Sequence, residues 1–197
     1  MIERELKFLA TPEKGDVSGL LVRPEGASHL LVLGHGASTN MRHATLRAIA
    51  EALADAGIAT LRYNFPYAEH GTGRDSQAVC TQTIRAAVAL AREVAPGLPI
   101  LAGGHSFGGR MTSTAASESP LDGVHGLVFF SFPLHQPGKP ETKRPKGFFP
   151  RIDAITVYAI AIERVTGKET SLPPLSEQWP AKDRSKTPNA SPPAQDA

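Results

Sequence analysis

Short apolar runs alternate with segments of helical periodicity from residue 17 onward. Strands are expected at the apolar runs, and a nearly all-apolar run such as 29–36 is typical of a strand covered on both faces. Helices are expected where apolar residues recur at i, i+3, i+4 and i+7. The predicted strands are 17–24, 29–36, 58–65, 99–104 and 124–133, and the predicted helices are 41–56, 79–95 and 107–118.

The order of these elements predicts the class of fold. Helix 41–56 has clear end signals, because Asn40 can cap its start and Gly57 follows its end. Strands and helices that alternate in this way predict an α/β fold with a mostly parallel sheet and helices on both faces. Ligands bind such sheets beyond the carboxyl ends of the strands. The loops to examine are therefore 34–40, 64–75, 104–108 and 132–142.

Composition and charge limit the possible functions. The 197 residues fit one domain, and 41% hydrophobic and 20% charged residues are typical of a globular protein. The net charge of +2 comes from residues after 142, without the aromatic interleaving or basic helix face that would indicate nucleic-acid binding. The single cysteine, Cys80, suits a reducing compartment and lies in a helical pattern, so it is expected in the core or at its boundary.

Two further patterns concern membranes and domain limits. The N-terminus lacks a signal-peptide pattern, and the apolar run 154–162 is too short to cross a bilayer, so a cytoplasmic protein without a membrane span is expected. We expect a core over 1–142 and a divergent, basic, proline-broken segment over 143–163 with one strand or helix. The proline-rich, polar segment 164–197 is expected to be disordered, because it has too little apolar surface to offset the entropy of ordering.

The pattern GHSFG at 104–108 follows a predicted strand and begins a predicted helix. At such a turn the serine, Ser106, has an exposed hydroxyl, and a side chain on either glycine would clash with neighbouring backbone. The N-terminus of the new helix then faces any negative charge that develops. Ser106 is therefore a candidate nucleophile for attack on a carbonyl carbon. The alternative is a structural glycine turn whose serine caps the helix.

A second pattern, GHGAS at 34–38, comes at the end of another predicted strand. In hydrolases of this architecture such a loop supplies one of the two backbone N–H groups that bind an oxyanion. Here the two donors would be the N–H groups of Ala37 and Phe107. Each such donor contributes about 3 kcal/mol of transition-state stabilisation in other enzymes. For the ring of His35 we favour a structural role.

Four ordered stretches within 29–141 make the chain similar to a known superfamily: LVLGHGASTNMRH, GIATLRYNFPYAE, LAGGHSFGGRM and GLVFFSFPLHQPGKPE. They resemble the dienelactone-hydrolase-like branch of the α/β-hydrolases. Within it they are most similar to bacterial hydrolase-like proteins related to the Tex-thirty proteins and to the third subunit of the NSL histone-acetyltransferase complex.

The resemblance implies a three-layer α/β-hydrolase fold with a nucleophile at Ser106 and an oxyanion hole at Ala37 and Phe107. It also implies site walls at 64–69 and 133–140. The residues assigned to the site loops are His35, Gly36, Tyr67, Gly104, His105 and Gly108.

The resemblance ends before the acid and the base of the triad. The superfamily has the chain order serine, acid, histidine, and only His125 and His135 follow the serine here. His125, at the start of a strand, is expected to be structural or on the surface. His135 follows the strand expected beside the serine's strand and is a candidate base, although family members share that stretch and have a separate base. Asp153 and Glu163 are acid candidates without a supporting motif, so the last strand or strands of the sheet are expected to be missing.

Other side chains near the expected site have simpler interpretations. His43 and His70 lie on relevant loops and are expected to be solvated. Tyr67 and Arg62 could bind substrate, but a core aromatic residue and a solvated arginine are favoured. Arg110, four residues after the candidate nucleophile, is expected in a structural ion pair. No cofactor or metal is expected.

Three hypotheses for the function follow. The first is a small serine hydrolase that forms an acyl-enzyme at Ser106 with an ester, thioester or lactone, impaired if the acid and base are missing. The second is an inactive hydrolase-like module that interacts with or regulates a protein partner. The third is a truncated or frame-shifted hydrolase whose sequence after residue 142 is not the family's own. None involves nucleic acid or a membrane, and the oligomeric state is not predicted.

Overall fold

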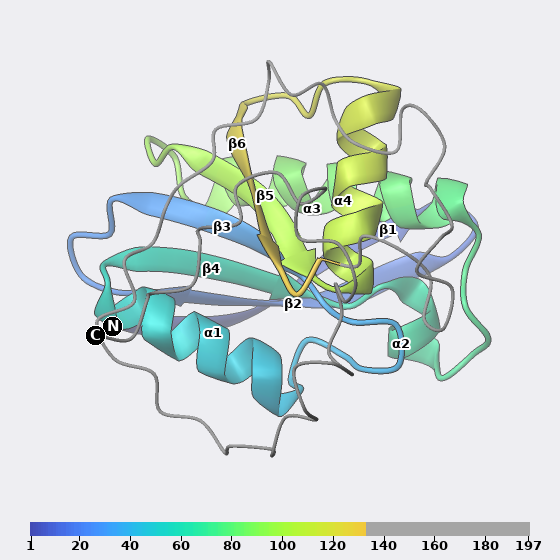
Figure 1. Ribbon diagram of the computed structural model, residues 1–197, viewed down its shortest axis with the longest axis horizontal. Helices are drawn as coiled ribbons and strands as arrows, with labels where there is room; N and C mark the ends of the chain where they lie inside the picture. Colours follow the sequence, from blue (N-terminus) through green and yellow to red (C-terminus); the bar gives the residue numbers. More distant parts are fainter. Residues whose placement is uncertain (133–197) are drawn as a thin grey trace, which may run out of the picture. The chain divides into compact units, whose positions relative to one another are not determined.

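The computed structural model describes residues 1–132, in which six strands form one sheet in the order β1-β2-β4-β3-β5-β6 (Figure 1). The strands are β1 (Ile2–Thr11), β2 (Gly15–Arg23), β3 (His29–Gly34), β4 (Ile58–Tyr63), β5 (Ile100–His105) and β6 (Val124–Phe130). The helices are α1 (Ala44–Asp55), α2 (Pro66–His70), α3 (Gln77–Val94) and α4 (Phe107–Glu118).

The sheet is mostly parallel, as predicted. Strands β4, β3, β5 and β6 run parallel to one another. The β1–β2 hairpin extends this parallel part, with β2 antiparallel to both β1 and β4. Because β3 and β5 are neighbours, the loops that follow them emerge at the same edge of the sheet. This edge is where the sequence places the two candidate site motifs.

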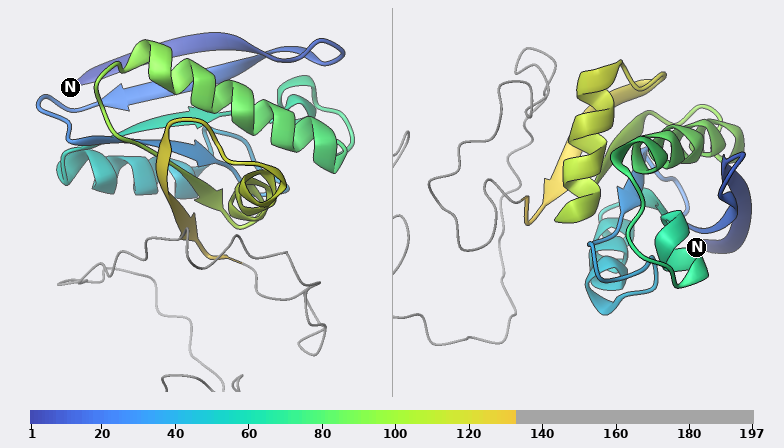
Figure 2. Two further views of the ribbon diagram at one scale, coloured as in Figure 1. Left: turned by 90° about the horizontal axis from the view of Figure 1, so that it is seen from above. Right: turned by 90° about the vertical axis from the view of Figure 1, so that its right-hand side faces the viewer.

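Helices cover both faces of the sheet, which confirms the predicted three-layer α/β-hydrolase architecture. On one face, Leu46 of α1 packs against Leu31 and Leu33 of β3. On the other face, α3 and α4 bury residues such as Ile84 and Met111 in the larger core cluster. Figure 2 shows α1 and α3 on opposite sides of the strands. Cys80 lies in the buried face of α3, as expected.

Strand β1 was not predicted from the sequence. It pairs with β2 along one side only and forms an edge of the sheet, so most of its residues are exposed. Its charged residues are all exposed, and its apolar contribution to the core comes from Leu6, Phe8 and Ala10. The weak apolar signal of an edge strand is the physical reason that it was missed.

Two other expectations about elements were wrong. Residues 66–70 were assigned to a loop, but they form the short helix α2, with Pro66 in its first turn and Gly71 in the left-handed conformation at its end. Helix α1 begins at Ala44 rather than at residue 41, and His43 rather than Asn40 is its cap residue. The Nδ1 atom of His43 accepts the N–H of Thr45 at 3.3 Å.

The expected limits of the core at residue 142, the segments 143–163 and 164–197, and the expected loss of the last strands concern residues outside the described range. They stay predictions.

Strand β3, strand β5 and helix α4 approach so closely that three glycines meet. A Cβ atom added at Gly104 would lie 2.6 Å from the carbonyl carbon of Gly108. A Cβ added at Gly108 would overlap the carbonyl group of Gly34. Since backbone cannot move aside as a flexible side chain can, only glycine fits at these positions. The contact holds the loop after β3 against the turn that contains Ser106.

We expect Gly108→Ala to destabilise the fold by about 1–3 kcal/mol, because the added methyl group overpacks this backbone contact. The matched control is Gly73→Ala, since Gly73 has an ordinary φ and nothing lies within 4 Å of the added Cβ. That control should change the stability by no more than about 1 kcal/mol. Urea unfolding of both variants measures the difference, and equal stabilities would show that the glycine contact is not tight.

Candidate active site

Ser106 occupies the turn between β5 and α4 in a strained backbone conformation. Its φ is 51° and its ψ is −105°, a region in which a residue other than glycine costs of order 1–3 kcal/mol. The turn is fixed on both sides: the Ser106 N–H donates to the carbonyl of Phe130 at 2.9 Å, and the Ser106 carbonyl accepts the N–H of Arg110 at 3.0 Å.

The hydroxyl of Ser106 does not cap helix α4, although the residue occupies the cap position. Within residues 1–132 it has no hydrogen-bond partner. The interpretation of Ser106 as a capping serine is therefore wrong. A half-buried serine is held in a strained conformation while its hydroxyl serves no structural bond.

The loop after β3 lies beside this turn. A Cβ added at Gly36 would lie 3.3 Å from Nδ1 of the half-buried His105, so the ring of His105 contacts this loop. The neighbouring residue, Ala37, is half-buried and packs against the core. Neither the N–H of Ala37 nor the N–H of Phe107 has a hydrogen-bond acceptor among the described residues. The two N–H groups expected to bind an oxyanion are thus both unpaired.

The peptide group between Gly36 and Ala37 is anchored through its carbonyl oxygen. This oxygen accepts hydrogen bonds from Nδ1 of His35 at 2.7 Å, from the hydroxyl of Thr39 at 3.1 Å and from the hydroxyl of Tyr67 at 3.4 Å. A trans peptide is planar, with its C=O and N–H groups pointing in opposite directions. These bonds therefore also fix the direction of the Ala37 N–H.

His35 is fully buried, and its ring is committed to the backbone. Its Nε2 atom accepts the N–H of Phe65 at 3.1 Å, so the proton of the neutral ring is on Nδ1, which donates to Gly36. Burial lowers the pKa of His35 to about 4, against the smaller opposing effect of the hydrogen bond to Gly36. A neutral ring with both nitrogen atoms engaged holds the loop in place, which is the structural role favoured from the sequence.

An aromatic cluster forms the floor beneath the two loops. The ring of Phe65 is 5.0 Å from that of His35, 6.0 Å from that of Tyr67 and 5.6 Å from that of Phe107. Tyr67 is only 7% exposed, which confirms the core interpretation rather than a substrate-binding one. Its backbone N–H donates to Asp75 at 2.7 Å, so the first turn of α2 is tied to the segment that follows the helix.

Glu69 ties α2 to the antiparallel part of the sheet. Its carboxylate accepts the hydroxyl of Ser18 in β2 at 2.7 Å and the side-chain amide of Asn64 at 2.7 Å. Asn64 in turn accepts the N–H of Met41 at 2.8 Å. Burial opposes ionisation of this half-buried carboxyl group, but the hydrogen bonds outweigh it and lower the pKa of Glu69. Hydrogen bonds thus fix both ends of the segment 64–69, and its role as a wall of the site stays a prediction.

No histidine among residues 1–132 is hydrogen-bonded to Ser106. His43 caps α1, and the exposed ring of His70 is bonded to the carbonyl of Lys14 at 3.1 Å. His125 is exposed at the start of β6, in agreement with the surface role expected for it. Burial, and next the charge of His43, lowers the pKa of His105. The candidate base His135 and the acid candidates Asp153 and Glu163 lie outside the described residues.

The expectation for Arg62 was wrong, and the one for Arg110 is not met among the described residues. Arg62 is buried rather than solvated, and it donates to the carbonyl of Met41 at 3.2 Å. Arg110 has no carboxylate partner within residues 1–132, so the expected ion pair is absent there. Its guanidinium group lies instead over the ring of Phe107, 5.3 Å from the ring centre, and Arg74 lies 5.2 Å from the same centre.

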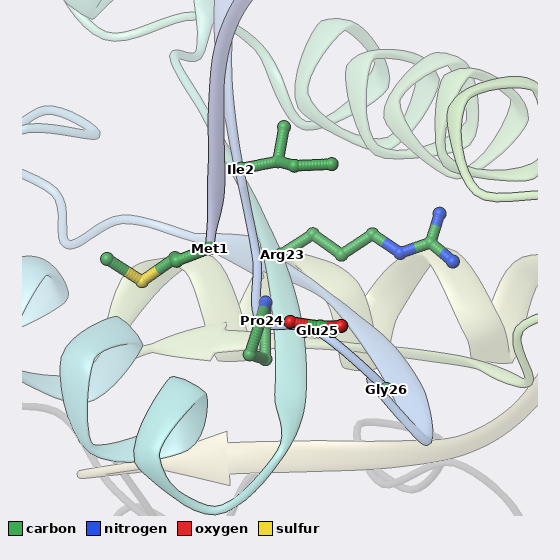
Figure 3. A pocket seen from close by; sticks show the side chains of 6 residues that line it. All are labelled: Met1, Ile2, Arg23, Pro24, Glu25 and Gly26. Atoms are coloured by element: carbon green, nitrogen blue, oxygen red, sulfur yellow. The ribbon is translucent and has the colours of Figure 1, made fainter.

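A pocket of ≈ 380 Å³ lies at the end of the sheet opposite to the end that carries Ser106 (Figure 3). It is lined by Met1, Ile2, Arg23, Pro24, Glu25 and Gly26. These residues belong to the start of β1, the end of β2 and the turn before β3, whereas Ser106 follows the carboxyl end of β5. This pocket is therefore separate from the candidate active site.

Among residues 1–132, no three or more His, Cys, Asp or Glu side chains are grouped so that they could hold a metal ion. In the same range, the helices are too short or too polar to cross a membrane.

Comparison with known proteins identifies the family. The model of the alpha/beta hydrolase domain family matches residues 27–158, which is more than half of the chain. The chain therefore belongs to this family of α/β hydrolases, and the match extends past the stretch that shows the resemblance in the sequence. A comparison with curated protein sequences finds no match.

Solved structures of serine hydrolases and a dienelactone hydrolase have the same fold. A dienelactone hydrolase from Anabaena variabilis is 23% identical with a TM-score of 0.54, and the match covers 64% of this chain and 62% of that protein. An α/β serine hydrolase homologue from Coxiella burnetii is 21% identical with a TM-score of 0.58, covering 75% and 67%. An α/β serine hydrolase without a lid from Xanthomonas campestris is 20% identical with a TM-score of 0.57, covering 73% and 67%. The dienelactone-hydrolase-like fold is thus shared, and the chain spans 62% of that dienelactone hydrolase.

Because His35 is buried in its neutral form, the stability of the folded protein should depend on pH. Its pKa in the folded protein, about 4, is below the ordinary value of 6.5, so the unfolded chain takes up a proton first as the pH falls. The stability that it contributes is present above pH 6.5 and is lost as the pH falls toward 4. Between pH 7 and pH 5 this single group should reduce the free energy of unfolding by about 2 kcal/mol.

Urea unfolding of the wild type and of His35→Gln at both pH values measures this loss, which the variant should lack. The control is His125→Gln, because His125 is exposed on β6. If wild type and His35→Gln lose the same stability between the two pH values, His35 is not the titrating group.

Proposed function

We propose that the chain is a serine hydrolase that forms an acyl-enzyme at Ser106 with a small-molecule ester, thioester or lactone. The observation that supports this best is the strained turn at Ser106. Its hydroxyl has no hydrogen-bond partner among residues 1–132, and the N–H of the next residue, Phe107, has no acceptor in the same range. A strained residue with no structural bond of its own is typical of a nucleophile position. Membership in the α/β hydrolase family supports the same proposal.

The proposed reaction has two steps. The Oγ atom of Ser106 attacks the carbonyl carbon, and the oxyanion that forms accepts hydrogen bonds from the N–H groups of Ala37 and Phe107. The carbonyl then re-forms, and the base returns the proton to the alcohol or thiol, which leaves, or which stays attached to the acyl group when the substrate is a lactone. Water next attacks the acyl-enzyme and releases the acid together with free Ser106. The developing negative charge also lies at the N-terminus of α4, where the helix dipole favours it.

The reaction needs a base for the proton of Ser106, and we propose His135 for this role. It is the only histidine after Ser106 other than the exposed His125. The finer affiliation with relatives of the Tex-thirty proteins and of the NSL third subunit, and a cytoplasmic location, are part of the same proposal. The single buried cysteine supports that location.

A second candidate is an inactive hydrolase-like module that binds a protein partner. It is favoured by one observation, namely that no histidine among residues 1–132 reaches Ser106. The nucleophile and the two donors would then remain from an active ancestor.

A fluorophosphonate probe and a short-chain p-nitrophenyl ester separate the two candidates. Under the hydrolase proposal the wild type is labelled, and Ser106→Ala loses the label together with about three or more powers of ten in kcat/KM. The matched control is Ser117→Ala, an exposed serine of the same helix, which should keep both properties. His135→Gln should lower kcat as Ser106→Ala does if His135 is the base. A folded wild type that is neither labelled nor active would contradict the hydrolase and favour the module.

A further inference from the structure

Two guanidinium groups share one aromatic ring beside the proposed nucleophile. The guanidinium carbons of Arg74 and Arg110 lie 5.2 and 5.3 Å from the centre of the Phe107 ring. Phe107 directly follows Ser106, and its ring is otherwise surrounded by the rings of Phe65 and Tyr67. The two cations therefore lie next to the proposed site rather than elsewhere on the surface.

The position of each arginine in the fold is consistent with a role in substrate binding. Arg74 belongs to the segment 71–76 between α2 and α3, which follows the carboxyl end of β4. Arg110 is four residues after Ser106, so the two side chains are neighbours on one face of the helix. Both arginines thus approach the carboxyl edge of the parallel strands, where ligands of such sheets bind.

Neither arginine has an acidic partner within residues 1–132. The Nε atom of Arg110 is buried and has no hydrogen-bond acceptor among these residues. Asp75, which directly follows Arg74 in the chain, is already occupied, because its two oxygen atoms bind Lys14 at 2.8 Å and the N–H of Tyr67 at 2.7 Å. Positive charge is therefore in excess around the ring.

A purely structural role explains one arginine better than two. A single guanidinium group over an aromatic ring gains a cation–π interaction and covers apolar surface. A second cation at the same ring repels the first, and burial together with the charge of Arg74 lowers the pKa of Arg110. An anion bound by both guanidinium groups would relieve this repulsion.

We propose that Arg74 and Arg110 form an anion-binding subsite beside Ser106, so that the substrates are esters with a carboxylate or phosphate group. This inference rests on the proposed function. The guanidinium fork of arginine matches the geometry of both anions. The anion would bind to the two guanidinium groups while the ester carbonyl lies at Ser106. The subsite selects anionic esters over neutral esters of the same length.

Matched esters test this selection. The anionic substrate is mono-p-nitrophenyl glutarate, its neutral partner is the p-nitrophenyl ester of monomethyl glutarate, and the corresponding phosphonate tests the second anion. The wild type should have the higher kcat/KM for an anionic ester. Arg74→Gln and Arg110→Gln should each lower the ratio of anionic to neutral kcat/KM about tenfold or more, because each loses a charge-assisted hydrogen bond.

Two further variants make the test specific. Arg110→Lys keeps the charge and should retain part of the ratio, whereas a loss caused by repacking around Phe107 would be the same for Lys and Gln. The control is Arg92→Gln, because Arg92 is paired with Asp122 and should leave the ratio unchanged. Added salt should lower the wild-type ratio, since it screens exposed charges.

Calorimetric titration of Ser106→Ala with glutarate keeps this inference separate from the proposed function. If Ser106→Ala binds glutarate and the double variant with Arg110→Gln does not, the subsite is supported even if the wild type hydrolyses no ester. Hydrolysis of both esters with a ratio near one in wild type and variants would overturn the subsite and leave the hydrolase standing. Absence of both glutarate binding and selective hydrolysis in a folded protein would overturn the subsite.

Discussion

The candidate site depends on a contact between backbone segments that leaves no room for a side chain. Strand β3, strand β5 and helix α4 meet at Gly34, Gly104 and Gly108, where backbone lies directly on backbone. Because of this contact, two loops that are about seventy residues apart in the chain lie side by side. The hydroxyl of Ser106 belongs to these loops, as do the N–H groups of Ala37 and Phe107, which have no acceptor in the described part of the chain. Glycine is needed here for close approach rather than for flexibility.

The second requirement is a set of groups that hold the loops without entering the chemistry. His35 combines full burial, a single tautomer and two backbone partners, so it serves as a rigid spacer rather than as a proton carrier. The hydroxyl groups of Thr39 and Tyr67 add further bonds to the same carbonyl oxygen. Several weak bonds on one acceptor define a direction more sharply than one strong bond would. Orientation of a backbone donor is what electrostatic catalysis requires.

The sequence predicts the parallel part of the fold well, because each buried strand is a strong apolar run and each helix has a periodic apolar face. It fails at β1, where an edge strand needs little apolar surface, and at α2, where five residues are too few to show a period. The roles of Arg62 and Arg110 were missed for another reason. Whether an arginine is solvated, buried or stacked on a ring depends on neighbours that are distant in sequence, as with Arg74 on Phe107. The motif of Ser106 was recognisable, but its unused hydroxyl was visible only in three dimensions.

The hydrogen bond between Glu69 and Ser18 gives the antiparallel β1–β2 hairpin a mechanical role. Glu69 fixes α2 to β2, and Tyr67 on the same short helix bonds to the carbonyl of Gly36. A sliding of β2 along β4 would therefore reach the Gly36–Ala37 peptide through α2. Strand β2 thereby acts as a brace for the loop after β3. Changes in the hairpin should therefore alter the geometry of the candidate active site, although the contact between the two is indirect.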